Sequence, residues 1–306
     1  MSANQPDGIS VILATCRGAG RIGRALNSLA RQTLAPERFE VVVSVNGPDD
    51  GTTAVVERFA AAHPAMNIVV TASPQASVSR ARNIALELAR MGYFTVLDDD
   101  DWVSPEYLGA LLERCAPGRV ATTFVCDVPV DGPRTFSHYL GEAVARWAGR
   151  TMPATELPSL TSANGGKAAP TQLGRRALFP PQVSSGEDVV FWSRLVTQRV
   201  RQVAVLPIHA RAFYYRHVRS ASVSRRSDDQ WVEDRLVVIA ELKTLSADFP
   251  AWAQRFAFAV YGQCVSLGQA AAARPELLDD LSARLEPLAT HHQFEAFWRA
   301  ARPEAR

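Results

Sequence analysis

Two hydrophobic patterns alternate along residues 9–97, and this alternation is the strongest constraint on the fold. Short apolar runs rich in β-branched residues are typical of strands buried on both faces of a sheet. Between them, apolar residues recur every three or four positions, as in helices that cover a sheet. The strand-like runs are residues 9–15, 40–45, 67–72 and 93–97, and the helical patterns are residues 22–30, 55–62 and 78–88. Strands that alternate with helices form right-handed βαβ units, so the sequence predicts an α/β fold with a mainly parallel sheet.

The segments that directly follow the predicted strands are where a ligand is expected. In open parallel sheets, ligands bind beyond the carboxyl ends of the strands. In this chain those ends lead into residues 15–17, 46–50, 73–75 and 98–101. We therefore expect the functional site to be assembled from these four segments.

Composition excludes several classes of protein. The chain has 306 residues, of which 47% are hydrophobic and 21% charged, as in ordinary globular proteins. Its formal net charge of +2 is too small to favour nucleic acid as a partner. The four cysteines are widely spaced and form no C-x-x-C pair, which argues against a zinc site and for reduced thiols. Residues 1–8 resemble no signal peptide and no run approaches the roughly 18 apolar residues of a membrane span, so we expect a cytoplasmic protein.

Four consecutive aspartates, Asp98, Asp99, Asp100 and Asp101, directly follow the fourth predicted strand. Adjacent carboxylates at a sheet edge repel one another, and several cannot stay ionised and half-buried without a nearby cation. Mg²⁺ or Mn²⁺ suits such oxygen ligands and keeps positions open for substrate phosphates. The alternative is that these residues cap the next helix or form a solvated loop. Their position at the end of an apolar strand favours the metal site.

Six short motifs occur together in an order and spacing that resembles the family 2 glycosyltransferases. They are SVI at 10–12 with Thr15, SLARQT at 28–33, NGPDDGT at 46–52, SRARN at 79–83, LDDDD at 97–101 and GED at 186–188. The resemblance covers roughly residues 8–226. It implies the GT-A fold, a Rossmann-like, mainly parallel sheet flanked by helices. It also implies transfer of a sugar from a nucleotide-sugar donor to a saccharide or lipid-linked acceptor.

The same resemblance implies roles for the residues around the donor. Asp100 would be the principal metal ligand, and Asp98 would contact the donor ribose directly or through metal-bound water, with Asp99 between them. The metal would bridge the donor diphosphate and offset charge on the leaving nucleoside diphosphate. The other expected donor contacts are Thr15 and Arg17 at the nucleobase, and Arg82 and Asn83 on the nucleotide side.

Asn46 departs from the family pattern at one of these positions. The family commonly has an Asp-Asp-Gly turn after the second strand, in which an Asp reads the uracil edge, whereas this chain has Val45-Asn46-Gly47. An Asn amide offers both a donor and an acceptor and can still bond a base. We therefore keep a UDP-sugar as the expected donor, with Asn46 as its base contact.

Glu187 and Asp188 lie at the start of a predicted helix. Carboxylates in a first helical turn complement the positive end of the helix, and this alone explains the pair. The family resemblance implies instead that Asp188 is the general base of an inverting transfer. It would take the proton of the acceptor hydroxyl while that oxygen attacks the anomeric carbon. Glu187 would then hold an acceptor hydroxyl or a neighbouring side chain.

Two further positions keep two interpretations each. Lys167 follows a turn-rich stretch and is either a phosphate or sugar contact or a solvated lysine. His217 lies in a segment that resembles one approaching the diphosphate in the family, and it either completes the metal shell or is a structural or surface histidine. Residues 201–226 also hold six arginines and no acid. These arginines would bind diphosphate or face anionic lipid, so we allow for peripheral contact with the inner face of a membrane.

Long helical patterns without a recognised motif follow residue 229. We expect a C-terminal helical domain or cap at 229–306, attached to a transferase domain at 1–228. Its aromatic residues serve core packing, sugar stacking or a homo-oligomer interface. Two other functions stay open: a Mg-dependent nucleotidyltransferase, whose Gly- and Arg-rich residues 16–24 would hold a triphosphate, and an inactive transferase-fold scaffold.

Overall fold

The computed structural model describes residues 7–130, 135–136, 141, 144–218 and 228–302. Its main feature is an eight-stranded sheet. In spatial order the strands are β3 (Ile68–Ser73), β2 (Phe39–Asn46), β1 (Ile9–Thr15), β4 (Tyr93–Val96), β10 (Lys167–Pro170), β6 (Arg119–Thr122), β11 (Gln202–Val205) and β9 (Thr151–Pro153). The four strands expected from the alternating pattern, β1 to β4, are therefore neighbours at one side of the sheet.

These four strands run parallel to one another. The antiparallel strands of the sheet lie beyond β4. β1 pairs in parallel with β2 and with β4, and β2 pairs in parallel with β3. β10 is antiparallel to both β4 and β6, and β9 is antiparallel to β11. The predicted α/β class with a mainly parallel sheet is confirmed.

A second, four-stranded sheet lies next to the aspartate run. Its order is β5 (Trp102–Val103), β12 (Phe213–Val218), β7 (Phe124–Pro129) and β8 (Thr135–Phe136). β5 follows Asp101 directly and pairs with β12. This pairing brings a strand from more than 100 positions later in the chain to the carboxyl end of β4.

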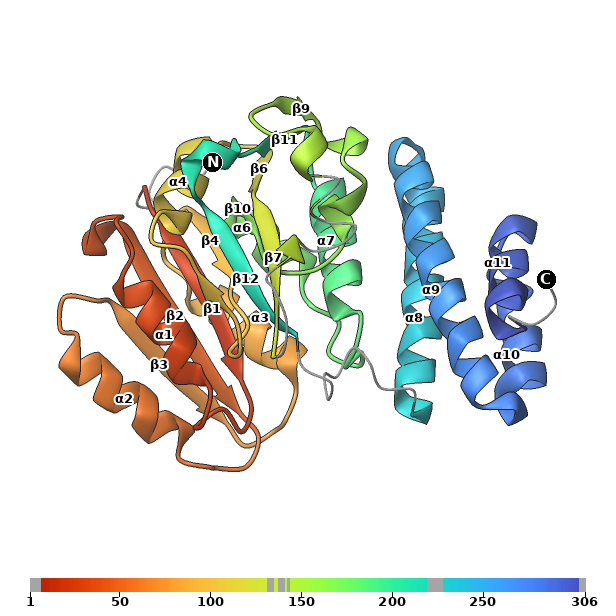
Figure 1. Cartoon of the computed structure of the whole chain (residues 1–306), viewed down its shortest axis with the longest axis horizontal. Coiled ribbons are helices and arrows are strands. Elements are labelled where there is room, and N and C mark those ends of the chain that lie inside the picture. Colours follow the sequence, from red (N-terminus) through yellow and green to blue (C-terminus); the bar gives the residue numbers. More distant parts are fainter. Residues whose placement is uncertain (1–6, 131–134, 137–140, 142–143, 219–227, 303–306) are drawn as a thin grey trace.

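Helices flank both faces of the main sheet (Figure 1). The α-helices for which the described residues give bounds are α1 (Ile22–Ala30), α2 (Thr52–Ala62), α3 (Val78–Leu88), α4 (Tyr107–Arg114), α6 (Thr171–Ala177), α7 (Glu187–Thr197), α8 (Asp229–Asp248), α9 (Ala253–Ala273), α10 (Leu278–Leu285) and α11 (His291–Ala301). Successive strand residues point to opposite faces. Val11 and Leu13 accordingly pack with α1 and α4, whereas Ile12 packs with α3 and α7.

The C-terminal helices extend the hydrophobic core that Ile12 forms with α3 and α7, and they do not form a separate core. Trp192 of α7, Ile239 of α8 and Phe256 of α9 belong to the same buried cluster as Ile12. Figure 1 shows α8 and α9 beside α7, with α10 and α11 outside them. The predicted C-terminal helical region thus begins with α8, and its buried side chains pack in the same core as one face of the sheet. Among the described residues, no helix has the length and apolar character needed to cross a membrane.

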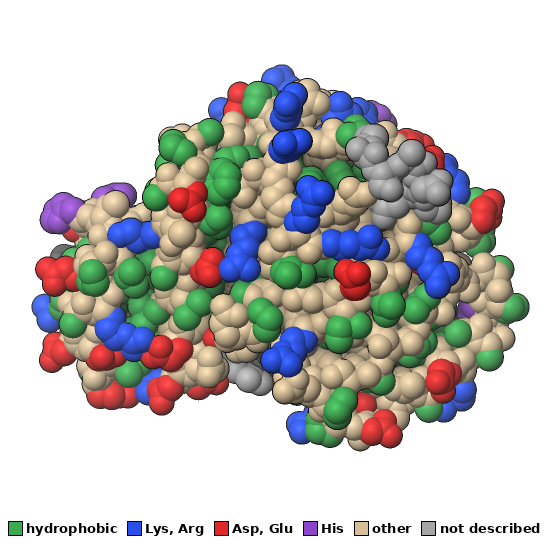
Figure 2. Space-filling view, turned by 180° about the vertical axis from the view of Figure 1, so that it is seen from behind, with side chains coloured by type: hydrophobic (Ala, Val, Ile, Leu, Met, Phe, Trp, Pro, Cys, Tyr) green, Lys and Arg blue, Asp and Glu red, His purple; other side chains and the backbone are tan. Residues whose placement is uncertain are grey.

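Basic side chains are dispersed on the face opposite to the view of Figure 1. Figure 2 shows single basic side chains over the larger body and acidic ones gathered at the lower edge of the C-terminal helices. This pattern agrees with a net charge of +2 and gives this face no continuous basic surface of the kind that binds nucleic acid.

Candidate active site

The loop between β1 and α1 is fastened to the second aspartate of the run. Thr15 donates a 2.5 Å hydrogen bond from Oγ1 to Oδ2 of Asp99. Arg21 donates from Nε to Oδ1 of Asp99 at 2.9 Å and forms a 2.8 Å ion pair with Oδ2. Arg21 also donates to the carbonyl groups of Cys16 and Arg17. Asp99 therefore holds the predicted nucleobase loop in place, and Arg21 is a site residue that the sequence did not single out.

Asn46 connects the ends of β1 and β2 to the start of α3. Its Nδ2 donates to the carbonyl oxygen of Thr15 at 2.8 Å, and its Oδ1 accepts from the main-chain N–H of Ser77 at 3.0 Å. The side chain is buried. Each half of the amide keeps one further hydrogen-bonding position, so contact with a nucleobase stays compatible with this arrangement.

Asp50 closes the same end of the site from the turn after β2. Its carboxylate accepts from the hydroxyl and main-chain N–H of Thr52 and from the N–H of Ala19. The N–H of Gly18 in turn donates to the Thr52 hydroxyl at 3.0 Å. The bond from the Thr52 hydroxyl is the main reason that the pKa of Asp50 lies below its ordinary value. The ionised carboxylate thus ties the turn after β2 to the loop after β1.

Arg82 joins the two groups of carboxylates to which the sequence gave separate roles. From α3 it donates to Oδ1 of Asp98 at 2.7 Å and to Oε1 of Glu187 at 2.5 Å, although Glu187 is 105 positions later. The Arg82 side chain is only 6% exposed, and its guanidinium lies 5.2 Å from the ring centroid of Phe179. The aspartate run and the Glu187–Asp188 pair therefore belong to one connected network.

Burial and charge act in opposite directions on this network. Burial lowers the pKa of Arg82, but the charges of Asp98 and Glu187 outweigh it, and the pKa ends above its ordinary value. Burial raises the pKa of Glu187 to about 7; the Arg82 guanidinium opposes this rise and the neighbouring Asp188 adds to it. Glu187 therefore exchanges its proton near neutral pH.

A Glu187→Gln variant should show this titration in its stability. Between pH 4.5 and about 7 the folded chain keeps the Glu187 proton that the unfolded chain releases. The wild-type free energy of unfolding therefore falls across this window as pH rises, by on the order of 3 kcal/mol, and levels off above it. Urea unfolding of both proteins from pH 5 to pH 8 measures the difference. A difference between the two proteins that does not change with pH would contradict a raised Glu187 pKa.

Asp101 attaches β12 to the end of the aspartate run. Its Oδ2 accepts from the hydroxyl of Tyr214 at 2.6 Å, and its Oδ1 accepts from the main-chain N–H of His217 at 2.7 Å. Tyr214 also accepts from the N–H of Asp98 at 3.2 Å. Burial raises the pKa of Asp101 well above its usual range, and the charges of Asp98 and Asp100 raise it further. This buried contact places His217 beside the aspartates.

Asp100 and His217 line a common cavity of about 360 Å³. The other lining residues belong to the loop before α1 and to its first turn: Ala19, Gly20, Arg21, Gly23 and Arg24. Asp99 and Asp101 point their carboxylates into the framework instead. Of the four aspartates, Asp100 is thus the one that faces this cavity, as its predicted role requires.

The donor set fits a hard divalent cation that is shared with a nucleotide. Among the described residues, no cluster of three or more His, Cys, Asp or Glu side chains could hold a metal on its own. Mg²⁺ is usually bound by one or two carboxylates, with substrate phosphates and water in the other positions. Asp100 lines the cavity and the Asp98 side chain is 38% exposed, so both have the chemistry for this arrangement.

Two of the predicted donor contacts bond to the protein main chain instead. Lys167 is buried, donates from Nζ to the carbonyl groups of Leu160 and Ser162, and lies 4.1 Å from the ring centroid of Trp192. Burial lowers its pKa well below the usual range. Asn83 exchanges two 2.8 Å hydrogen bonds with the main chain of Phe179. Both residues therefore belong to the framework behind the site, and the solvated alternative for Lys167 is wrong.

Arg17 adopts a left-handed backbone conformation in the β1–α1 loop, with φ of 52°. Its side chain is exposed, while its carbonyl oxygen accepts a hydrogen bond from Arg21. The arginine is therefore carried on a loop whose backbone is fixed. This placement leaves the side chain available at the predicted nucleobase end.

Asp188 lies in the first turn of α7, where the helix N-terminus favours negative charge. Gly186 caps the helix with φ of 88°, and a Cβ at this position would lie 3.0 Å from Nη1 of Arg235. The charge of Asp188 acts on two buried cations, raising the pKa of Lys167 and of Arg235 against the larger effect of burial. The predicted base is therefore a half-buried carboxylate whose charge acts on both Lys167 and Arg235.

Helix α8 holds the segment that precedes Glu187 and Asp188. Asp234 accepts from the N–H and the hydroxyl of Ser184 at 3.0 and 2.6 Å. Arg235 donates to the hydroxyl of Ser185 at 2.8 Å and to Gln263 of α9 at 2.7 Å. The C-terminal helices thus position the candidate catalytic segment. No sequence motif marked Asp234 or Arg235.

This chain is thus an α/β protein whose carboxylate cluster lies at the carboxyl ends of parallel strands, the edge at which such sheets bind ligands. The family model described as glycosyl transferase family 2 matches residues 10–179. The chain belongs to this family, as its motifs predict.

Curated relatives match parts of the chain. Glycosyltransferase AglE of Haloferax volcanii is 32% identical over 92 residues, which are 30% of each chain. The poly(ribitol-phosphate) beta-N-acetylglucosaminyltransferase TarS of Staphylococcus aureus is 26% identical over 257 residues, covering 78% of this chain and 41% of TarS. The chain therefore spans less than half the length of these relatives.

Solved structures share the fold over almost the whole chain. The complex of S. aureus TarS 1-349 with UDP-GlcNAc has a TM-score of 0.64 and 20% identity, covering 96% of this chain and 90% of that one. The mannosyltransferase PcManGT of Pyrobaculum calidifontis, in complex with GDP-Man and Mn²⁺, has a TM-score of 0.61 and 18% identity, covering 99% and 87%. The predicted GT-A fold with a C-terminal helical region is confirmed.

Proposed function

We propose that the chain is a metal-dependent, inverting glycosyltransferase that uses a nucleotide-sugar, with a UDP-sugar as the first candidate. The observation that carries the proposal is the Arg82 bridge. It connects Asp98, in the predicted donor and metal site, to Glu187, which adjoins the predicted base Asp188. Donor activation and acceptor deprotonation have to occur on opposite sides of one anomeric carbon, and this network supports both at one sheet edge.

The donor nucleotide lies, in this proposal, along the ends of β1 and β2. Thr15, Arg17 and Asn46 surround the nucleobase, and Asp98 reaches the ribose. Mg²⁺ or Mn²⁺ would be held by Asp100, with Asp98 and His217 beside it, and would offset charge on the leaving diphosphate. Arg82 orients Asp98, and the rigid loop held by Asp99 excludes water from the base.

Asp188 acts as the general base on the acceptor side. It accepts the proton of the acceptor hydroxyl while that oxygen forms a bond to the anomeric carbon. The bond from this carbon to the diphosphate oxygen breaks on the opposite face, its electron pair leaves with the nucleoside diphosphate, and the configuration inverts. Glu187, fixed by Arg82, holds the helix turn that carries Asp188 and orients an acceptor hydroxyl.

The known complexes define which donors to test. The TarS structure contains UDP-GlcNAc, and the PcManGT structure contains GDP-Man with Mn²⁺. UDP and GDP donors are therefore both candidates for this chain, and a saccharide or lipid-linked compound is the candidate acceptor. Because the chain belongs to a glycosyltransferase family, we do not pursue the nucleotidyltransferase alternative.

Calorimetric titration of UDP and GDP, with and without Mn²⁺, tests the donor site. We expect one nucleotide to bind only in the presence of metal, and Asp100→Asn to weaken that binding by at least about tenfold, because the substitution removes a metal ligand. Asp279→Asn, an exposed position on α10, is the matched control and should bind as wild type does. Binding that needs neither metal nor Asp100 would contradict the proposed metal-dependent donor site.

A further inference from the structure

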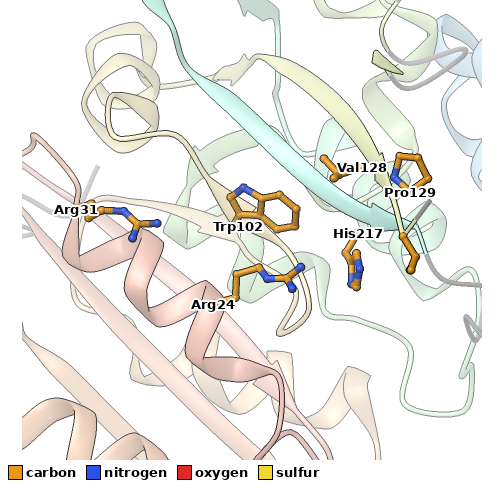
Figure 3. Close-up of a pocket in the computed structure, with 7 residues that line it drawn as sticks. Arg24, Arg31, Trp102, Val128, Pro129 and His217 are labelled. Atoms are coloured by element: carbon orange, nitrogen blue, oxygen red, sulfur yellow. The ribbon is translucent and has the colours of Figure 1, made fainter. Parts of the chain in front are cut away.

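A larger cavity, of about 510 Å³, adjoins the one at Asp100, since Arg24 and His217 line both. Figure 3 shows Arg24 of α1 and Arg31, the residue after α1, projecting toward Trp102, with His217 of β12 on the far side. The remaining wall is the apolar end of β7 with the residue after it, Val128, Pro129 and Val130. We call this cavity the arginine pocket.

Among the described residues that line it, the arginine pocket has basic side chains and no acidic one. Arg24 lies in α1, and Arg31 directly follows its last residue, Ala30. The two are seven positions apart, which is about two helical turns or roughly 10 Å along the axis, so both are on the same side of the helix. Both side chains are exposed to solvent. The nearest carboxylate along β7, that of Asp127, is occupied by a bidentate pair with Arg216 at 2.7 and 2.8 Å. The two guanidinium groups of the pocket therefore keep their charge available.

Trp102 fixes the orientation of one of these groups. The guanidinium carbon of Arg24 lies 4.8 Å from the centroid of the indole ring, and the ring stacks on Tyr215 with centroids 5.6 Å apart. A guanidinium that rests its face on an aromatic ring keeps the N–H donors at its edge for other partners. Arg24 is thus preorganised to donate into the pocket.

We propose that the arginine pocket binds a phosphate group carried by the acceptor, which would be a phosphate ester rather than a neutral sugar. This inference rests on the proposed transfer function and names the acceptor class for it. Two guanidinium groups spread along about 10 Å of helix suit a phosphate, which offers oxygens in several directions, better than a planar carboxylate with two. The apolar wall at Val128 and Pro129 suits the carbon skeleton of the ester.

The position of the pocket agrees with an acceptor role. Arg24 and His217 form its border with the cavity at Asp100, so a ligand in the arginine pocket lies next to the proposed donor diphosphate without occupying its site. The phosphate belongs either to a soluble phosphate ester or to a lipid headgroup. Both sources present the same group to Arg24 and Arg31, and the test distinguishes them.

Titration with inorganic phosphate, followed by the indole ¹H–¹⁵N signal of Trp102, tests the site directly. A Trp102→Phe variant assigns the signal. We expect phosphate to shift it saturably, and Arg31→Gln to weaken phosphate binding by about five- to tenfold through loss of one charged donor pair. Arg58→Gln, an exposed arginine on α2, is the matched control and should bind phosphate as wild type does. If phosphate does not shift the Trp102 signal, or if Arg31→Gln binds phosphate as tightly as wild type does, the proposal is overturned.

A second arm identifies the source of the phosphate. Co-sedimentation with phosphatidylglycerol vesicles, compared with phosphatidylcholine vesicles, is measured for wild type and Arg31→Gln. Weaker binding of the variant to phosphatidylglycerol supports a lipid headgroup, whereas equal vesicle binding with reduced phosphate binding supports a soluble ester. Because Arg31 lines the arginine pocket and not the cavity at Asp100, UDP affinity in the presence of Mg²⁺ should be unchanged. A chain that binds phosphate here but no nucleotide would refute the donor site and leave the pocket standing.

Discussion

Asp188→Asn is expected to lower kcat by about 10²–10⁴-fold, which is the usual contribution of a general base. The amide keeps the shape of the carboxyl group and can still accept the hydrogen bond from the N–H of Val189, so the start of α7 should be retained. It cannot take a proton from the acceptor hydroxyl. The loss should therefore fall on kcat, while the affinity for the donor nucleotide changes by less than about threefold.

Release of the nucleoside diphosphate from the donor selected by calorimetry measures this effect. Asp279→Asn makes the same chemical change on α10, far from α7 in the chain, and should leave kcat unchanged. Urea unfolding of both variants shows whether the fold is intact. If Asp188→Asn turns over as fast as wild type does, Asp188 is not the base and the carboxylates at the start of α7 only complement the helix end.

The strands next to the site are the part of the fold that local sequence determines. β1 spans Ile9–Thr15 as predicted. β2 and β3 differ from their expected bounds by one residue at each end, and β4 ends one residue early. These runs are unambiguous because each is apolar, short and bounded by turn formers. The loops that follow them were therefore identifiable as the ligand edge before any side chain was placed.

Strand pairings between segments that are distant in the chain have no comparable signal in the sequence. β5 has two residues, and its partner β12 lies more than 100 positions later. The reversal of β10 depends on pairing with both β4 and β6, which its own residues do not encode. Hydrophobic periodicity describes one segment at a time, so it cannot reveal which segments become neighbours.

The residues of the candidate site likewise fall into two groups, those that the local sequence indicates and those that only the folded chain identifies. Residue type and position indicated Asp98, Asp100, Glu187 and Asp188, because carboxylates at strand and helix ends are informative locally. Arg21, Asp234 and Arg235 act through partners that are 50 or more positions away, and only the folded chain identifies them. Lys167 shows the opposite case: it follows a turn-rich stretch, yet the fold buries it against Trp192.

Arg82→Met is expected to be the most destabilising of the substitutions considered for this chain. Arg82 is the buried partner of Glu187 and Asp98, and removing one member of a buried ion pair typically costs about 3–5 kcal/mol because a buried charge is left unpaired. Asp98 is partly exposed and can be solvated, so most of the cost should come from Glu187. Urea unfolding at pH 8 measures it, with Arg80→Met, an exposed position on the same helix, as the control.

The pH dependence separates the loss of this ion pair from a general packing defect. Without the guanidinium that lowers it, the pKa of Glu187 should rise further, so the folded variant keeps the proton to higher pH. Arg82→Met should therefore be less destabilising at pH 5.5, where Glu187 is neutral, than at pH 8, where burying it costs stability. Adding Glu187→Gln should recover much of the loss at pH 8, since neither member of the pair then carries a charge. Equal destabilisation at both pH values, with no recovery in the double variant, would show that Arg82 contributes packing alone.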